Sequence, residues 1–421
     1  MFARLVRRAT APIAVTALGL GLIAATGPAP AAAPETHTSA TRWSAAWAAS
    51  PQTPSTGFTP NWSQEGFSRQ TVRQVVRVTG AGDQVRIRLS NAYGTSPLHV
   101  TGATIARTDK AAAVRPGTVR HLTFRGKRSV AIPAHGELRT DPAPLALQRL
   151  DSVTVTLHFA GTTGPATFHS QAWTDSYRAD GDHRADVSGD AFTETTQSWY
   201  YLSGVDVTGR AEPRPKGGVV LFGDSITDGF GSTTNADRRY SDALAERLDR
   251  PVLNAGIGGN LVLNDSAWYG ERSTARFGRD ALDQPGVSTV ALLQGVNDLG
   301  FSEADGQPTY KPSPVVSTEE LIAGYRTLIA AAHARGVRIV GSTLLPLKGT
   351  THWGPHSAQV SDEVNQWIRT SGEFDAVVDF DRLLADPADP DRLNPAYAYE
   401  DGLHPNDAGY RAMAAAVAPL V

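Results

Sequence analysis

The amino-acid sequence predicts a chain of two domains, an all-β domain followed by an α/β domain with a parallel sheet. Residues 43–207 hold many short segments in which apolar and polar residues alternate, with few helical windows between them. This pattern is typical of antiparallel strands with one solvated face. From residue 219 onward, apolar runs alternate instead with helical windows, as they do in parallel sheets covered on both faces. The length of 421 residues also favours more than one domain.

The first 33 residues have the features of a secretory signal peptide. A short basic segment precedes an apolar run, and Ala29-Pro30-Ala31 supplies the small residues of a cleavage site. A membrane anchor is the alternative interpretation, but the apolar run is short for a membrane span. We therefore expect residues 1–33 to be removed, residues 34–41 to be a disordered leader, and the mature protein to be secreted without a stable membrane anchor. Arg7-Arg8 leaves the choice between Sec and twin-arginine export open.

The composition excludes several classes of function. The chain has no cysteine, so disulfides, cysteine nucleophiles and thiolate zinc sites are ruled out. The formal net charge is −3, and loss of the signal peptide removes three arginines and no acid. A mildly acidic protein has no basic surface for nucleic acid or for an anionic membrane. We expect no cofactor and no nucleic-acid partner.

The first domain is predicted to be a β-sandwich-like accessory domain over residues 42–208. Residues 72–78 and 85–89 alternate apolar and charged side chains, and 153–159 is a further strand candidate. Weaker strand candidates are residues 121–124 and 129–132. The segment 209–218 is polar and rich in proline, which predicts a linker.

The second domain is predicted to cover residues 219–421. Its clearest helix runs from Ser317 to Arg335, where Ser317 and Glu320 have the spacing of a capping box and Gly336 follows the end. The strand candidates are residues 219–222, 252–253, 289–293, 337–340 and 376–380. Sites in such sheets form outside the carboxyl ends of the strands.

Residues with complementary chemistry follow several of these strands. Ser225 comes directly after the first strand, Gly259 after the second and Asn297 after the third, whereas Asp401 and His404 precede the last helix. Acyl transfer by a serine needs a base, a carboxylate that orients the base, and donors for the oxyanion. His404 is the candidate base and Asp401 its partner. The N–H groups of Ser225 and Gly259, with the side-chain amide of Asn297, are the candidate oxyanion donors.

These segments resemble the consensus blocks of the SGNH hydrolases, also called the GDSL esterase/lipase family. Gly223-Asp224-Ser225 is similar to the block that carries the family's nucleophile, and Asp401-Gly402-Leu403-His404 to the D-x-x-H block of its base. Gly259 and Asn297 match the family's oxyanion-hole glycine and asparagine. The resemblance covers residues 219–421 and implies a flavodoxin-like, three-layer fold and an esterase activity. Residues 42–208 more loosely resemble the β-domain of some secreted actinobacterial members.

Alternative interpretations of single residues remain open. A Gly-Asp-Ser segment after a strand is often only turn chemistry. Asp379 is a rival partner for the base, because it also lies at a strand end. The rim aspartates are candidate ligands of a magnesium ion, although capping aspartates are commoner, and we predict no metal site. The candidates for the substrate pocket are Asn260, Trp268 and Trp353.

The sequence therefore predicts a secreted serine esterase of the lipase or carboxylesterase type, acting through an acyl-enzyme on a small-molecule or polymeric ester. A carbohydrate acetylesterase that acts on acetylated polysaccharide is the alternative. Two other classes, a metal-dependent phosphoesterase and a non-catalytic glycan-binding protein, also remain to be tested. In each case, contact between the first domain and a polysaccharide is a further possibility.

Overall fold

The computed structural model describes residues 42–209, 217–304 and 306–421, which belong to one compact unit. The predicted signal peptide and leader, and most of the predicted linker, lie outside the described residues. We call residues 42–209 the β half and the remaining described residues the α/β half. No helix in the described ranges is long and apolar enough to cross a membrane.

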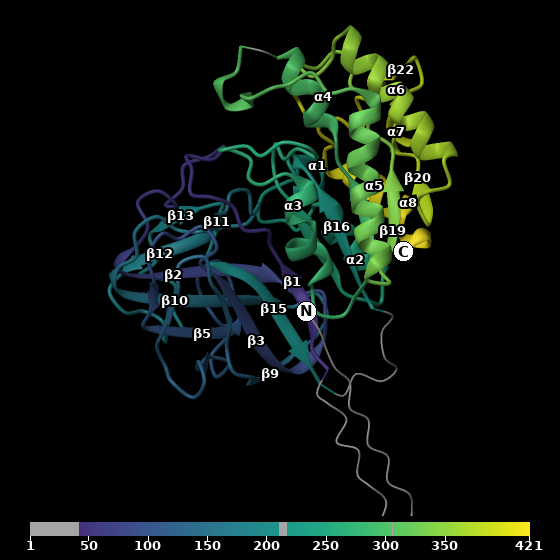
Figure 1. The fold of residues 1–421 in the computed structure, drawn as a ribbon. Helices are drawn as coiled ribbons and strands as arrows, with labels where there is room; N and C mark the ends of the chain where they lie inside the picture. The colour runs from purple at the N-terminus through teal and green to yellow at the C-terminus, as the bar shows by residue number, and fades with distance from the viewer. Residues whose placement is uncertain (1–41, 210–216, 305) are drawn as a thin grey trace, which may run out of the picture. The chain divides into compact units, whose positions relative to one another are not determined.

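The β half consists of antiparallel sheets, as the alternating sequence pattern predicts (Figure 1). One sheet pairs β1 (Ser44–Ala48), β15 (Leu202–Thr208), β3 (Gly82–Ser90) and β8 (Glu137–Arg139), and β9 (Ala143–Leu147) also pairs with β3. The second sheet has the order β13 (Glu194–Thr196), β12 (Ser176–Asp180), β2 (Ser68–Arg77), β10 (Ser152–Thr162), β5 (Gly102–Arg107) and β6 (Arg120–His121). Two short pairs complete the half, β4 (Leu98–Val100) with β7 (Val130–Ile132) and β11 (Phe168–His169) with β14 (Trp199–Tyr200).

The two large sheets share one apolar core. Alternate residues of β10, among them Val155 and Leu157, are fully buried in it beside Ile87 and Leu89 of β3. The strands expected at residues 72–78, 85–89 and 153–159 lie within β2, β3 and β10, so these predictions are confirmed. The candidate at 129–132 contains the short strand β7, whereas of residues 121–124 only His121 lies in a strand, the two-residue β6.

The α/β half contains one five-stranded parallel sheet. Its order is β17 (Val252–Gly256), β16 (Gly218–Gly223), β18 (Val287–Leu293), β19 (Arg338–Ser342) and β20 (Ala376–Val378). In chain order this is 2-1-3-4-5, the order of flavodoxin-like sheets. The point where the strand order reverses lies beside β16, so the carboxyl end of β16 is the favoured place for a site.

Helices cover both faces of this sheet (Figure 1). Val220 and Phe222 of β16 point into a core that includes α5 and α6, whereas Val219 and Leu221 point into a core with α2 and α8. This alternation explains the continuous apolar run, because a parallel strand buried on both faces has no polar side. The helices are α1 (Ser225–Asp228), α2 (Tyr240–Arg247), α3 (Ser273–Phe277), η1 (Gly278–Leu282), α4 (Val296–Glu303), η2 (Pro308–Tyr310), α5 (Thr318–Ala334), α6 (Pro355–Thr370), α7 (Phe380–Leu384), α8 (Asp407–Val417) and η3 (Ala418–Leu420). A small hairpin pairs β21 (Ala385–Asp386) with β22 (Asp389–Leu393).

The predicted capping box is present at the start of α5. The Ser317 hydroxyl accepts from Glu320 N, and Ser317 N donates to the Glu320 carboxylate. Gly336 follows the helix with a φ of +65°, a conformation that favours glycine. The helix therefore begins and ends where the sequence predicts.

The β half covers the edge of the parallel sheet. Thr79 Oγ1 donates to Val252 O at 2.8 Å and accepts from Val252 N at 3.0 Å, so it pairs with both backbone groups at the start of the edge strand β17. Ala45 and Ala48 of β1 belong to the same buried core as Leu253 of β17. The two halves are thus joined by packing and hydrogen bonds, and the exposed polar edge that an outer strand would present is covered here.

Candidate active site

Ser225 lies at the carboxyl end of β16, where the strand passes directly into α1. The Asp224 carboxylate caps this short helix by accepting from Ile226 N at 3.0 Å. Gly223 has no room for a side chain, since an ideal Cβ there would lie 2.2 Å from both Leu293 O and Thr227 Oγ1. The sharp passage from strand to helix leaves the Ser225 side chain on the rim of the sheet, although only 7% of the residue is exposed.

The structure brings Ser225, His404 and Asp401 into one hydrogen-bonded chain. Ser225 Oγ lies 2.7 Å from His404 Nε2, and His404 Nδ1 lies 2.6 Å from Asp401 Oδ2. The other oxygen, Asp401 Oδ1, accepts from the backbone N–H groups of Leu403 and His404. Partial burial opposes ionisation of Asp401, but these hydrogen bonds and the His404 ring lower its pKa below the usual value. An ionised Asp401 makes Nδ1 the protonated nitrogen, so the Nε2 lone pair faces the serine hydroxyl.

The imidazole of His404 is shielded by aromatic packing. The ring of Phe230 lies 4.3 Å from it between centroids, and the Tyr410 hydroxyl donates to Phe230 O. His404 is only 8% exposed. This packing limits the positions that the imidazole ring can take, which keeps Nε2 directed at Ser225.

The loop that contains Gly259 is tied to the nucleophile segment. Ile257 N donates to Gly223 O at 3.1 Å, and Gly258 N donates to Asp228 Oδ2 on α1 at 3.2 Å. Gly259 has a φ of +73°, and an ideal Cβ there would lie 2.4 Å from Tyr269 Cδ1. Both the backbone conformation and the closeness of Tyr269 therefore require glycine.

Asn297 lies on the first turn of α4 and contacts the same loop from the other side. Its Nδ2 donates to Asn260 O at 3.0 Å, and its Oδ1 lies 3.3 Å from His352 Nε2. One of the two N–H bonds on Nδ2 is thereby used within the protein. The second remains for a further acceptor.

This part of the chain also matches a known family. The sequence model of the GDSL-like Lipase/Acylhydrolase family matches residues 221–412, which include all five predicted catalytic and oxyanion residues. Residues 221–412 form a GDSL-like lipase/acylhydrolase domain. The predicted family resemblance is thus confirmed for residues 221–412 as a whole.

Solved structures similar to about half of this chain come from several bacteria. One is described as a lipolytic protein of the G-D-S-L family from Desulfitobacterium hafniense (18% identity, TM-score 0.38, 48% of this chain and 99% of that one). Another is described as an acylhydrolase from Bacteroides fragilis (19%, 0.37, 49% and 89%). A third is a catalytic mutant of an acetylxylan esterase from Geobacillus stearothermophilus (23%, 0.36, 49% and 94%). No curated protein matches the chain.

The three predicted pocket residues, Asn260, Trp268 and Trp353, lie in different surroundings in the GDSL-like domain. Asn260 is 0% exposed, and its amide donates to Tyr269 O and Glu271 O while its Oδ1 accepts from Ser273 and Arg276. This geometry does not support Asn260 as a pocket residue, since its side chain has no free polar group and instead holds its own loop. Trp268 and Trp353 are partly buried against two different apolar clusters.

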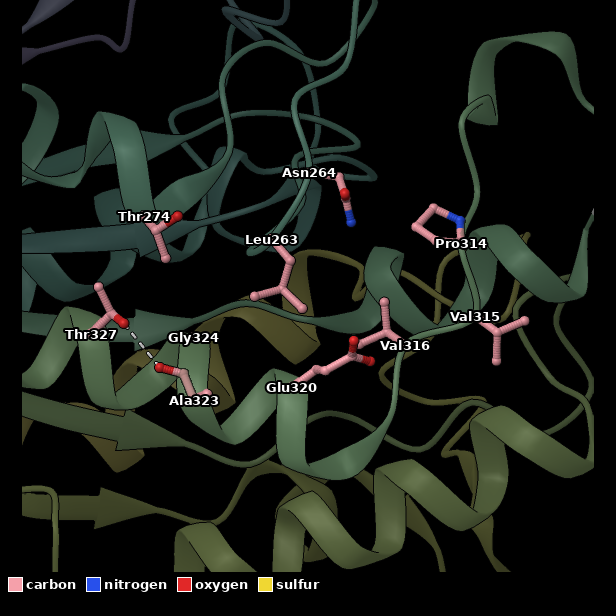
Figure 2. A pocket seen from close by; sticks show the side chains of 10 residues that line it. All are labelled: Leu263, Asn264, Thr274, Pro314, Val315, Val316, Glu320, Ala323, Gly324 and Thr327. Carbon is pink, nitrogen blue, oxygen red and sulfur yellow. Dashed lines mark hydrogen bonds between the residues drawn. The ribbon is translucent and has the colours of Figure 1, made fainter.

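A groove of about 490 Å³ lies elsewhere on the domain (Figure 2). Its lining residues come from α5, from the loop before it, from α3 and from the segment after Val262, as Figure 2 shows. None of the predicted catalytic, oxyanion or pocket residues lines it.

The rival partner of the base has another role. Asp379 accepts two hydrogen bonds from Arg369, both at 2.8 Å, and caps α7. Despite partial burial, these contacts lower the pKa of Asp379. Asp401 is therefore the acid that the structure places against His404.

The rim aspartates do not gather into a metal site. In the three described ranges, no group of three or more histidine, aspartate or glutamate side chains could hold a metal ion. Asp228 pairs with His169, and Asp298 accepts from Val262 N and Leu263 N. Burial raises the pKa of both Asp224 and Asp298 to about 7.

Three side chains at this site carry no recognisable signal in the sequence. Arg276 is fully buried and donates to Gly223 O, Ala255 O and Asn260 Oδ1, so it joins two strand ends to the loop of Gly259. His169 comes from the β half and reaches Asp228 on α1. His352 comes from the loop after β19 and reaches Asn297. The contacts named here join residues that are at least 16 positions apart along the chain, so spacing could not reveal them.

Proposed function

We propose that the protein is a secreted serine esterase that hydrolyses carboxylic esters through an acyl-enzyme. The observation that carries this proposal is the chain of contacts from Ser225 Oγ through His404 to Asp401, at 2.7 Å and 2.6 Å. Such a chain supplies the nucleophile, the base and the orienting carboxylate together. Export rests on the sequence of residues 1–33, and the boundaries 42–208 and 219–421 remain our proposal for the domains.

In the proposed mechanism, His404 Nε2 takes the proton of Ser225 Oγ as this oxygen attacks the ester carbonyl. The negatively charged Asp401 stabilises the imidazolium that forms and keeps its Nδ1–H in place. The tetrahedral intermediate then collapses, the bond to the alcohol breaks, and Nε2 gives its proton to the leaving oxygen. Water, activated by the same nitrogen, attacks the acyl-enzyme and releases the acid and free Ser225.

Three N–H donors are proposed to stabilise the oxyanion of both tetrahedral intermediates. They are the backbone N–H groups of Ser225 and Gly259 and the second N–H on Asn297 Nδ2. Each such donor contributes on the order of 3 kcal/mol to lowering the barrier. Two contacts support this assignment. Gly258 N donates to Asp228, which holds the loop of Gly259 against α1, and Asn297 Nδ2 donates to Asn260 O in the same loop. The donors at Gly259 and Asn297 are therefore held close to one another.

Hydrolysis of a panel of esters by the wild type and by Ser225→Ala tests the function. We expect p-nitrophenyl esters to be hydrolysed by the wild type, with loss of at least about 10³-fold in kcat for the variant. Rising acyl length in this panel, set against acetylated xylan or pectin, separates a lipase or carboxylesterase from a carbohydrate acetylesterase. Activity that a chelator abolishes, and that Ser225→Ala retains, would instead indicate a metal-dependent phosphoesterase. Retention of glycan binding without any hydrolysis would indicate a binding protein.

A further inference from the structure

His352 lies directly behind the proposed oxyanion donor Asn297. The residue is 3% exposed, and its Nε2 is 3.3 Å from Asn297 Oδ1. Its ring rests against α4 at Gly300, where an ideal Cβ would lie 1.9 Å from His352 Cδ2. The rings of Phe301 and Tyr310 pack against it at 5.8 and 6.0 Å between centroids. Glycine at position 300 thus makes room for the imidazole to reach the side chain one helical turn earlier.

The protonation state of His352 follows from this environment. Burial, with a smaller contribution from the nearby His404, lowers its pKa to about 4, although Asp401 opposes the shift. The imidazole is therefore neutral near pH 7 and carries one N–H. Because the carbonyl oxygen of an asparagine side chain can only accept, the proton must lie on Nε2. His352 Nδ1 is then the acceptor and faces Thr351 Oγ1 at 3.3 Å.

The side-chain amide of Asn297 is consequently held at both ends. His352 donates to its oxygen, and its nitrogen donates to Asn260 O, which also accepts from Gln294 Nε2. With the oxygen fixed on the side of His352, the remaining N–H on Nδ2 has a set direction. Without the contact from His352, only the hydrogen bond to Asn260 O would hold the amide, and the direction of its remaining N–H would be less fixed.

We propose that His352 is a positioning residue of the reaction, which acts by orienting the amide of Asn297 toward the oxyanion. This inference rests on the proposed esterase function. It assigns His352 no contact with the substrate and no proton transfer, so His404 remains the single base. We therefore predict that removing the His352 donor lowers kcat, and that it does so only when Asn297 is present.

The test compares His352→Phe with His352→Gln. Phenylalanine fills the space but offers no donor, whereas the glutamine amide can place an N–H near the position of Nε2. We expect His352→Phe to lower kcat about tenfold or more, with little change in KM, since a misdirected donor loses part of its contribution to the barrier. His352→Gln should recover most of the rate. The pH profile of kcat/KM should keep its shape in both variants, because the group that titrates is elsewhere.

A double-mutant cycle with Asn297→Ala identifies the route of the effect. If His352 acts through Asn297, then His352→Phe should change kcat less than about threefold in the Asn297→Ala background. An equal loss in both backgrounds would overturn the proposal, as would an unchanged kcat in His352→Phe. If the wild type shows no hydrolysis that Ser225→Ala abolishes, the esterase function itself is refuted. If hydrolysis requires Ser225 but kcat is unchanged in His352→Phe, only this inference is refuted.

Gly300→Ala gives a second variant in case His352→Phe does not fold. Alanine favours the helix, but its Cβ would displace the imidazole, so we expect a lower kcat without loss of α4. Gly278→Ala is the matched control, since an ideal Cβ at Gly278 meets nothing within 4 Å. A kcat for Gly300→Ala equal to that of this control would contradict the proposal.

Discussion

His169 of the β half and Asp228 of α1 form a buried pair, with Nε2 3.0 Å from Oδ1. His169 Nδ1 also lies 3.0 Å from Ser50 O, and the second oxygen of Asp228 accepts from Gly258 N. A side chain of the β half is thus linked, through one carboxylate, to the loop of the proposed oxyanion donor Gly259. This relationship gives the β half a structural role at the site, independent of any contact with polysaccharide.

The His169 and Asp228 pair predicts a pH dependence of stability. Burial alone would lower the pKa of His169, but the charge and hydrogen bond of Asp228 outweigh it and raise the pKa above the usual value. The stabilisation is therefore fully present below about pH 6.5, the unfolded value, and is lost as the pH rises through the higher folded value. We expect the wild type to lose stability over this alkaline range, and His169→Leu to lose about 3 kcal/mol at pH 6. Urea unfolding of the wild type and of His169→Leu at pH 6 and pH 9 measures both changes in the free energy of unfolding. If the variant showed the same pH dependence as the wild type, the pair could not be its cause.

Asp401→Asn is expected to place the proton on the wrong nitrogen of His404. Two backbone N–H groups donate to Asp401 Oδ1, so a substituted amide would put its oxygen there and turn its NH₂ toward Nδ1. Nδ1 would then have to accept, and Nε2 would carry the proton. We predict a fall in kcat of about 10⁴-fold with the fold intact. Steady-state kinetics with p-nitrophenyl acetate measures it, and near-normal kcat would show that Asp401 does not orient the base.

Asn297→Ala is expected to affect the transition state much more than the ground state. Because the oxyanion exists only during the reaction, kcat should fall about 100-fold or more while KM changes little. Asn264→Ala, which removes an asparagine from the groove of Figure 2, is the control and should retain kcat. An effect of Asn297→Ala on KM alone would count against Asn297 as an oxyanion donor.

Gly259→Ala tests the second distant donor. The added Cβ would meet Tyr269 as well as strain the backbone, so we expect the loop to move and kcat to fall at least about tenfold. Gly126→Ala is the matched control: Gly126 has a φ of +77° and nothing within 4 Å of an ideal Cβ. It should lose about 1 kcal/mol of stability from the backbone strain alone, with unchanged kcat. Equal activities of the two variants would exclude a role for Gly259.

The sequence predicts those parts of the protein that depend on local patterns. The capping box at Ser317 marks the start of α5, and the apolar run at Val219–Phe222 identifies β16, the first strand of the parallel sheet along the chain, because each follows from neighbouring residues. The segments of Ser225, Gly259 and Asn297 each follow a strand, and parallel strands bring their carboxyl ends to one edge, so these three could be placed together. Asp401 and His404 precede the last helix, and they join this group through their chemistry and the family resemblance. The distances between these side chains are, however, a property of the folded sheet.

The supporting contacts could not be predicted, because they depend on tertiary packing. His169 belongs to a different half of the chain from Asp228, and Arg276 and His352 are polar residues in segments without any motif. The sequence makes Asn260 a candidate for the substrate pocket, but in the structure the buried Arg276 and neighbouring carbonyls take up its polar groups. Which side of a loop a side chain faces depends on partners that the local pattern does not contain.

The most direct test of the central claim is mass spectrometry after treatment with a fluorophosphonate. Only a serine hydroxyl activated by a neighbouring base reacts readily with this reagent. We predict a single adduct on the peptide that contains Ser225, formed in step with the loss of esterase activity and absent in Ser225→Ala. Full hydrolytic activity with Ser225 unmodified, or an adduct on another residue that accounts for the inactivation, would contradict the account.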